Sequence, residues 1–96
     1  MDVYKLSEEC KLDIANIYEF GIEKFGLNQA QQYILGLNDL FQTLADNVDI
    51  GRDASEFAPR LKRFSYKSHM VFYLVILSGV LIVRTLSQSM DYERHL

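Results

Sequence analysis

Met70 to Val83 reads MVFYLVILSGVLIV, two apolar runs separated only by Ser78-Gly79. A two-residue connection forces the strands on either side of it to pair antiparallel. The first run is apolar at nearly every position, which is typical of a central strand covered on both faces. A membrane helix needs about 20 consecutive apolar residues, more than this stretch supplies. We therefore predict a buried β-hairpin, with helices on one face and the C-terminal tail or a partner on the other.

Two further strands are predicted around this hairpin. Leu61–Tyr66 precedes it and is separated from it only by Lys67-Ser68, so the three runs are expected to form an antiparallel meander that ends at Leu86. Val3–Leu6 alternates as a short N-terminal strand would. Residues 49–59 contain glycine and proline and no sustained period, which predicts a loop.

Two amphipathic helices are predicted between the first strand and this loop. Ser7 followed by Glu8 and Glu9 is a helix start, and Gly26 is a natural stop. The stripe of the first helix is Cys10, Ile14, Ile17, Tyr18, Gly21, Ile22 and Phe25. Asn28 with Gln31 resembles a capping box, which would start a second helix. The stripe of the second helix is Ala30, Tyr33, Ile34, Leu37, Leu40, Phe41, Leu44, Ala45 and Val48.

The short connection between the helices makes them an antiparallel hairpin, whose joint apolar face packs on the sheet. Gly21 and Gly36 are expected to let the helices approach closely. The predicted fold is therefore α+β with the order β-α-α-β-β-β and a short C-terminal tail. The chain has 96 residues, which predicts a single domain over 1–96.

The charge and cysteine content narrow the classes of function. The formal net charge is −3, which argues against a surface that neutralises many phosphates, so we expect no direct nucleic acid contact except through a protein partner. Cys10 is the only cysteine, which excludes an internal disulfide. The N-terminus lacks the basic-then-apolar layout of a signal peptide, and we expect a cytoplasmic protein without a membrane partner.

The common catalytic motifs are absent from the sequence. It has no Walker loop, glycine-rich dinucleotide turn, His-Glu-x-x-His motif or paired cysteines, so we predict no catalytic site, metal or cofactor. Carboxylates along the first helix are interpreted as a solvated polar face. They are Glu8, Glu9, Asp13, Glu19 and Glu23.

One enzymatic alternative stays open, a metal-free ribonuclease. Such an enzyme works with cations that stabilise the phosphate and with groups that move protons from the 2′-hydroxyl. The residues that this chemistry would use are Lys62, Arg63, Arg84, Tyr92 and His95. The competing interpretation is that arginines at strand ends only solvate the sheet rim.

Short sequence pieces in a shared order carry a resemblance over nearly the whole chain. They are Tyr4-Lys5-Leu6-Ser7, Phe25-Gly26, Gln29-Ala30, Tyr33, Leu44-Ala45-Asp46-Asn47, Gly51-Arg52, Phe64, His69, Phe72-Tyr73, Ile82-Val83-Arg84, Met90-Asp91 and Arg94-His95-Leu96. In this order and spacing the chain resembles the ParE toxins of the RelE/ParE superfamily, which belong to bacterial type II toxin–antitoxin systems. The ending Met-Asp-x-x-Arg-His-Leu looks more like ParE than like RelE.

This resemblance implies a non-enzymatic toxin that inhibits or poisons DNA gyrase and is neutralised by a ParD-like antitoxin. A ribosome-dependent mRNA endoribonuclease of the RelE kind, or an inactive toxin fold that only binds its antitoxin, are the alternatives. The expected gyrase contacts lie in the tail and at the neighbouring strand end: Arg84, Met90, Asp91, Arg94 and His95. Aromatic anchors with an arginine rim are expected to bind the antitoxin: Tyr18, Tyr33, Phe57, Arg60 and Arg63.

Two positions depart from the pattern of the family that the chain resembles. Val48 stands where a proline usually follows Asn47, and Ser87 stands where a basic residue is common. The first departure is expected to change only loop stiffness, because proline acts mainly by fixing a backbone angle. The second removes a cation beside the tail.

Overall fold

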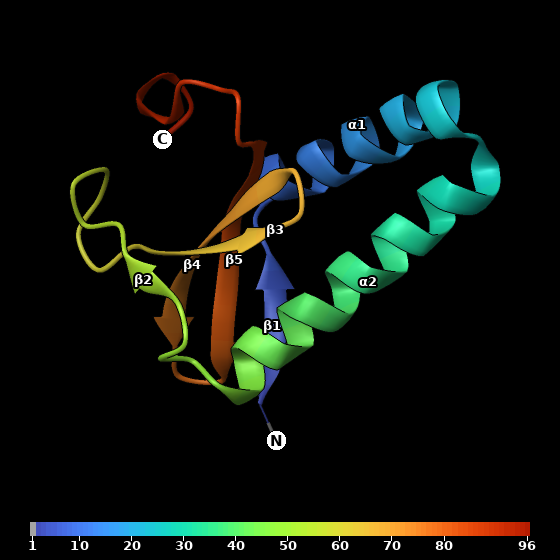
Figure 1. Ribbon diagram of the computed structural model, residues 1–96. Helices are drawn as coiled ribbons and strands as arrows, with labels where there is room; N and C mark the ends of the chain where they lie inside the picture. The colour runs from blue at the N-terminus through green and yellow to red at the C-terminus, as the bar shows by residue number, and fades with distance from the viewer. Residues whose placement is uncertain (1) are drawn as a thin grey trace.

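The computed structural model describes residues 2–96 and has the predicted α+β order, with one additional short strand (Figure 1). The elements are β1 (Val3–Leu6), α1 (Glu8–Phe25), α2 (Leu27–Asp46), β2 (Arg52–Asp53), β3 (Lys62–Tyr66), β4 (His69–Ile76), β5 (Gly79–Ser87) and the 3₁₀ helix η1 (Tyr92–Arg94). The additional strand is β2, in the segment that the sequence predicts as a loop. Among residues 2–96, neither helix has the length and apolar character needed to cross a membrane.

The five strands form one mixed sheet in the order β1-β5-β4-β3-β2. The meander from β3 to β5 is confirmed as antiparallel, and β2 adds antiparallel to β3. β1 instead runs parallel to β5, with Val3 opposite Gly79 and Leu6 opposite Ile82. Gly79 has φ of +143°, and a Cβ there would overlap the carbonyl oxygen of Val3, so this position requires glycine.

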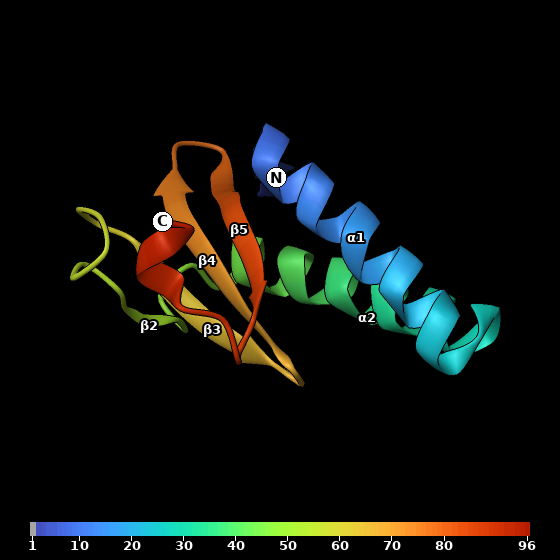
Figure 2. The same cartoon turned by 90° about the horizontal axis from the view of Figure 1, so that it is seen from above.

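The two faces of the sheet are covered differently (Figure 2). The helices cover one face, where Val71 and Tyr73 of β4 join a core with residues of α1, α2 and β5. Phe72, between them in the sequence, points to the opposite face and packs with Leu61 and Leu86 under the residues 54–61 loop and the tail. The prediction that β4 is covered on both faces is confirmed.

Ser7 sets the start of α1, and Gly26 sets both the end of α1 and the start of α2. Ser7 is the N-cap of α1, as predicted: its Oγ accepts a hydrogen bond from the Cys10 N–H at 2.9 Å and donates to the Val83 carbonyl at 2.6 Å. The capping box predicted at Asn28 is wrong, because α2 begins at Leu27 with Gly26 as its N-cap. Gly26 has φ of +88°, which lets one residue end α1 and begin α2.

The two helical glycines have different neighbours. Gly21 lies against α2, since a Cβ there would be 3.2 Å from that of Ala30, and this close approach is as predicted. Gly36 instead leaves space for the Tyr66 hydroxyl group from β3, so its predicted role between the helices is wrong. Gly36 therefore brings α2 close to the sheet rather than to α1.

The turn of the helical hairpin projects beyond the sheet (Figure 1). Ile22 and Phe25, expected in the buried stripe of α1, are 36% and 63% exposed. Their positions in the helix match the stripe, but the sheet does not extend far enough to cover them. Phe20 and Leu27 are also exposed, so the projecting end of the hairpin carries an apolar surface.

Candidate functional site

The C-terminal tail, Met90–Leu96, lies on the face of the sheet opposite the helices (Figure 2). Its inward side is aromatic: the ring of Tyr92 lies edge-on to the rings of Phe72 and Phe57, with centroids 5.1 and 6.1 Å apart. Leu96 packs against the same cluster. The outward side is polar, because the side chains of Asp91 and Arg94 are 61% and 82% exposed. The tail thus packs on the sheet with one side and exposes the other side to solvent.

Arg84 joins this tail to helix α1. Its Nε and Nη2 each donate to the carboxylate of Asp13 at 2.8 Å, and its Nη1 donates to the His95 carbonyl at 2.9 Å. Asp13 also accepts the Thr85 N–H at 3.0 Å, and Glu9 lies 3.6 Å from Arg84. The hydrogen bond with Asp13 is the main cause that raises the pKa of Arg84.

Asp13 is therefore not part of a solvated face, and that interpretation is wrong for this residue. Its side chain is 10% exposed, against 73% for Glu9 and 90% for Glu8. The sequence offers little signal for this difference, because the partner of Asp13 lies 71 residues away. Position in the helix is the only hint, since Asp13 is adjacent to the stripe residue Ile14.

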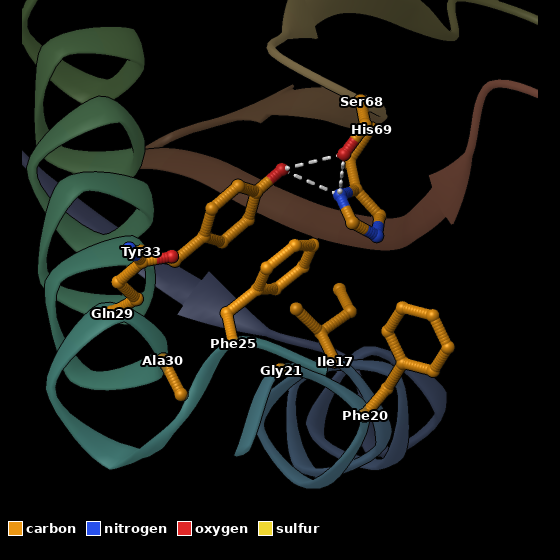
Figure 3. A pocket seen from close by; sticks show the side chains of 9 residues that line it. All are labelled: Ile17, Phe20, Gly21, Phe25, Gln29, Ala30, Tyr33, Ser68 and His69. Carbon is orange, nitrogen blue, oxygen red and sulfur yellow. Dashed lines mark hydrogen bonds between the residues drawn. The ribbon is translucent and has the colours of Figure 1, made fainter. Parts of the chain in front are cut away.

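A second surface is the hairpin groove, which lies between α1, α2 and the turn from β3 to β4 (Figure 3). Its apolar end is formed by Ile17, Phe20 and Phe25. At its polar end the Tyr33 hydroxyl group lies 2.6 Å from His69 Nδ1. Burial lowers the pKa of His69, which favours the neutral form of the ring beside the Tyr33 hydroxyl group. The groove is thus apolar along the helices and polar where they meet the sheet.

The predicted gyrase contacts are brought together in the tail and next to it. Met90 is 44% exposed, and Asp91, Arg94 and His95 are also exposed. Arg84 differs from these four, since its side chain is only 16% exposed and its nitrogens are bound within the chain.

The predicted antitoxin contacts are divided between the two faces. Tyr18 and Tyr33 belong to the helical hairpin, and Tyr33 lines the groove. Phe57 packs under Tyr92 on the tail face, where Arg63 of β3 lies 3.4 Å from Glu56. Arg60 is exposed and has φ of +66°. Phe20 and Phe25 line the groove but are not among the predicted binding residues, although an apolar residue outside the stripe, such as Phe20, is a usable signal.

Two of the five residues that the ribonuclease alternative would use are engaged in contacts within the chain. The guanidinium group of Arg84 is bound to the carboxylate of Asp13, and the ring of Tyr92 packs among aromatic side chains. In the chain from residue 2 onward, no three His, Cys, Asp or Glu side chains are grouped as metal ligands. Burial raises the pKa of Cys10 to about 11, so its sulfur is a thiol, near the Thr85 hydroxyl group.

Comparisons with known proteins agree with this arrangement. The family model for the ParE toxin of type II toxin-antitoxin system, parDE, matches residues 4–92. Toxin ParE1 of Mycobacterium tuberculosis is 34% identical over 94 residues, which are 97% of this chain and 96% of the relative. Toxin ParE1 of Caulobacter vibrioides is 31% identical over 96 residues, 100% of this chain and 99% of the relative.

The chain belongs to the ParE toxin family. It is thus the toxin of a ParDE type II toxin–antitoxin system, and its partner is an antitoxin. A solved structure described as "Chromosomal ParDE TA system from P. aeruginosa" has the same fold, with a TM-score of 0.76 at 16% identity. The alignment covers 91% of this ParE toxin and 96% of that chain.

The two departures from the family pattern have structural counterparts in this ParE toxin. The Tyr73 hydroxyl group donates a hydrogen bond to the Val48 carbonyl at 3.0 Å and accepts one from the Gly51 N–H at 2.9 Å. The loop after α2 is therefore held by Tyr73 without a proline. Ser87 lies within hydrogen-bonding distance of Ser89, 2.9 Å between their Oγ atoms, so the chain entering the tail is polar and uncharged there.

Proposed function

We propose that this ParE toxin stops growth by binding DNA gyrase through its tail and stabilising the cleaved-DNA state of that enzyme. It acts by binding and catalyses no reaction itself. The observation that carries the proposal is the two-sided tail, in which Tyr92 and Leu96 pack on the sheet while Asp91 and Arg94 stay exposed. A surface that is already ordered loses little conformational entropy on binding.

State selectivity is the physical requirement for a poison of this kind. A ligand shifts a conformational equilibrium only by the difference between its affinities for the two states. Met90, Asp91, Arg94 and His95 offer an apolar side chain, both charges and an imidazole on one short segment. Such a segment suits a surface that exists in only one state of a larger enzyme. Since gyrase and its DNA are in the cytoplasm, the toxin acts there, without direct nucleic acid contact of its own.

We further propose that a ParD-like antitoxin neutralises the toxin by laying an amphipathic helix or extended segment on its apolar surfaces. The exposed rings of Phe20 and Phe25 beside Tyr33 support the hairpin groove as one of these surfaces. Tyr18 lies on the same hairpin, whereas Phe57 contacts Tyr92 of the tail and Arg63 lies beside Glu56. Arg60 is an exposed residue just before β3. An antitoxin chain that reaches both regions would cover the groove and the tail together.

The direct test is plasmid supercoiling by purified gyrase, with refolded toxin added at rising concentration and linear DNA scored. We expect inhibition together with accumulated cleaved DNA. A variant that lacks residues 90–96 should leave gyrase unaffected and still bind the antitoxin. A matched control is Glu19→Gln, an exposed change on α1 far from the tail in sequence, which should behave as the wild type. Unaffected gyrase with the intact toxin would reject the proposed target, and cleavage of ribosome-bound mRNA would then be assayed.

A further inference from the structure

We propose that Asp13 and Arg84 form a positioning pair that fixes the tail in its active orientation, so that Arg84 acts through the tail and not by touching the target. The inference deepens the proposed function, since it concerns the same tail. It assigns a role to Asp13 of α1, which lies outside the hairpin groove and lines a second pocket together with Arg84, Met90 and His95.

The position of Arg84 at the edge of the sheet makes the bridge possible. β1 pairs with β5 only as far as Leu6 opposite Ile82, so β5 continues past the end of its neighbour. The register between β4 and β5 shifts there, since Phe72 pairs with Arg84 and Tyr73 with Ile82. Arg84 thus lies beyond the end of β1, within reach of both layers. Its side chain contacts α1 on one side of the sheet and the tail on the other.

The guanidinium group is occupied on all three of its nitrogens. Nε and Nη2 form a bidentate pair with the carboxylate of Asp13, and Nη1 binds the His95 carbonyl. Charge-assisted bidentate pairs are strong and geometrically specific, so Asp13 fixes the direction of the remaining N–H groups. A side chain that is 16% exposed and bound in this way has little surface left for a second protein.

The tail has two attachments of different kinds. The first is apolar, through Tyr92 and Leu96, and packing of this kind is not strongly directional. The second is the directional bond from Arg84 to the His95 carbonyl. Together, the apolar packing of Tyr92 and Leu96 and the hydrogen bond at His95 restrict both the position and the rotation of the segment that carries Arg94. Without the hydrogen bond from Arg84, the tail stays packed on the sheet but is no longer held in one orientation.

The test compares Asp13→Asn with Arg84→Lys in the full-length toxin. Asp13→Asn leaves Arg84 present but removes the carboxylate that directs it. Arg84→Lys keeps a cation beside Asp13 but has one nitrogen, which cannot serve both Asp13 oxygens and the His95 carbonyl. The readouts are backbone heteronuclear NOE values for residues 93–96, growth arrest in cells without antitoxin, and the toxin concentration that gives half-maximal gyrase inhibition.

We expect both variants to lower the NOE values of residues 93–96 while the sheet stays rigid, and to weaken growth arrest. The inhibitory concentration should rise about tenfold, the ratio that corresponds to losing one oriented charge-assisted contact. Asp13→Glu, which keeps the carboxylate, should recover part of the tail order, a rescue that general destabilisation would not give. Glu19→Gln serves again as the control that removes one charge from α1.

Two results would overturn the inference. An unchanged tail in both variants would remove the positioning role. Wild-type toxicity for Asp13→Asn together with loss of toxicity for Arg84→Lys would show that Arg84 contacts the target directly. The outcome does not depend on gyrase, because tail order and growth arrest are read without it. If the wild-type toxin leaves gyrase unaffected, gyrase is rejected as the target. Tail order and growth arrest still test whether Asp13 and Arg84 position the tail.

Discussion

The helix face and the tail face of the sheet share the strands but are built on different scales. Nine buried residues form the core beneath α1 and α2, whereas four form the core beneath the loop and the tail. The tail face relies more on aromatic rings at its margin and on one arginine at its edge. We therefore expect the helix face to provide most of the stability of the fold, and the tail face to contribute less.

The largest effect that we expect comes from the helix face. Phe41 of α2 is fully buried and its ring lies 5.5 Å from that of Tyr4. Phe41→Ala should lower the free energy of unfolding by about 3 to 5 kcal/mol, because a large buried side chain is replaced by a cavity. Urea denaturation measures this change. A loss below about 1 kcal/mol would mean that the helix face does not dominate stability.

A smaller effect is expected from the anchor of the tail face. Tyr92→Ala removes the ring contacts with Phe72 and Phe57, and should cost about 1 to 2 kcal/mol in urea denaturation. Growth arrest should be largely lost, because the tail is released. Binding to the antitoxin through the hairpin groove, measured by calorimetry, should persist. Tyr92→Phe is the matched control and should keep both properties. Full toxicity of Tyr92→Ala would break the assignment of function to this face.

A pH-dependent effect is expected where the hairpin meets the sheet. Burial lowers the pKa of His69 from its usual 6.5, so the unfolded chain takes up a proton more readily than the folded one. This contribution to stability is present above about pH 6.5 and is lost as the pH falls from there to the lowered pKa of the folded state. His69→Gln should flatten that part of the stability profile, measured by thermal unfolding. An equal flattening by His95→Gln, at an exposed position, would contradict the assignment.

The smallest effect on stability is expected at the exposed side of the tail. Arg94 and Asp91 lie 3.7 Å apart with both side chains exposed, and such pairs contribute little. Arg94→Ala should therefore change the free energy of unfolding by less than about 0.5 kcal/mol and yet reduce growth arrest. Lys24→Ala, a cation removed from the far end of α1, should reduce neither. A variant that is destabilised and fully toxic would reverse the proposed contrast between the faces.

The sequence predicts those elements whose cause is local. Periodicity gives both helices, the short connections give the antiparallel meander, and Ser7 with its two following glutamates gives the start of α1. The parallel pairing of β1 with β5 was not predicted, because it depends on residues 76 positions apart, such as Val3 and Gly79. The capping box at Asn28 failed because the conformational freedom of Gly26 outweighed a side-chain cap.

The candidate site was predicted less well than the fold, for a related reason. The tail residues stand out because their polar character contrasts with the strands before them. The pairing of Asp13 with Arg84 has little local signal beyond the position of Asp13 next to Ile14, since it is made between distant segments. Exposure of Phe25 likewise depends on how far the sheet extends beneath the hairpin, which a helical period does not encode.

The pairing of β1 with β5 also has a consequence for synthesis. β1 leaves the ribosome before both helices and the meander, yet among residues 2–96 the strand that pairs with it is β5. The sheet is completed only after β5 has been made, and contacts of this long range slow folding. Until then a nascent toxin lacks the completed sheet on which the tail packs. An antitoxin that is already present in the cell can bind the toxin during that interval.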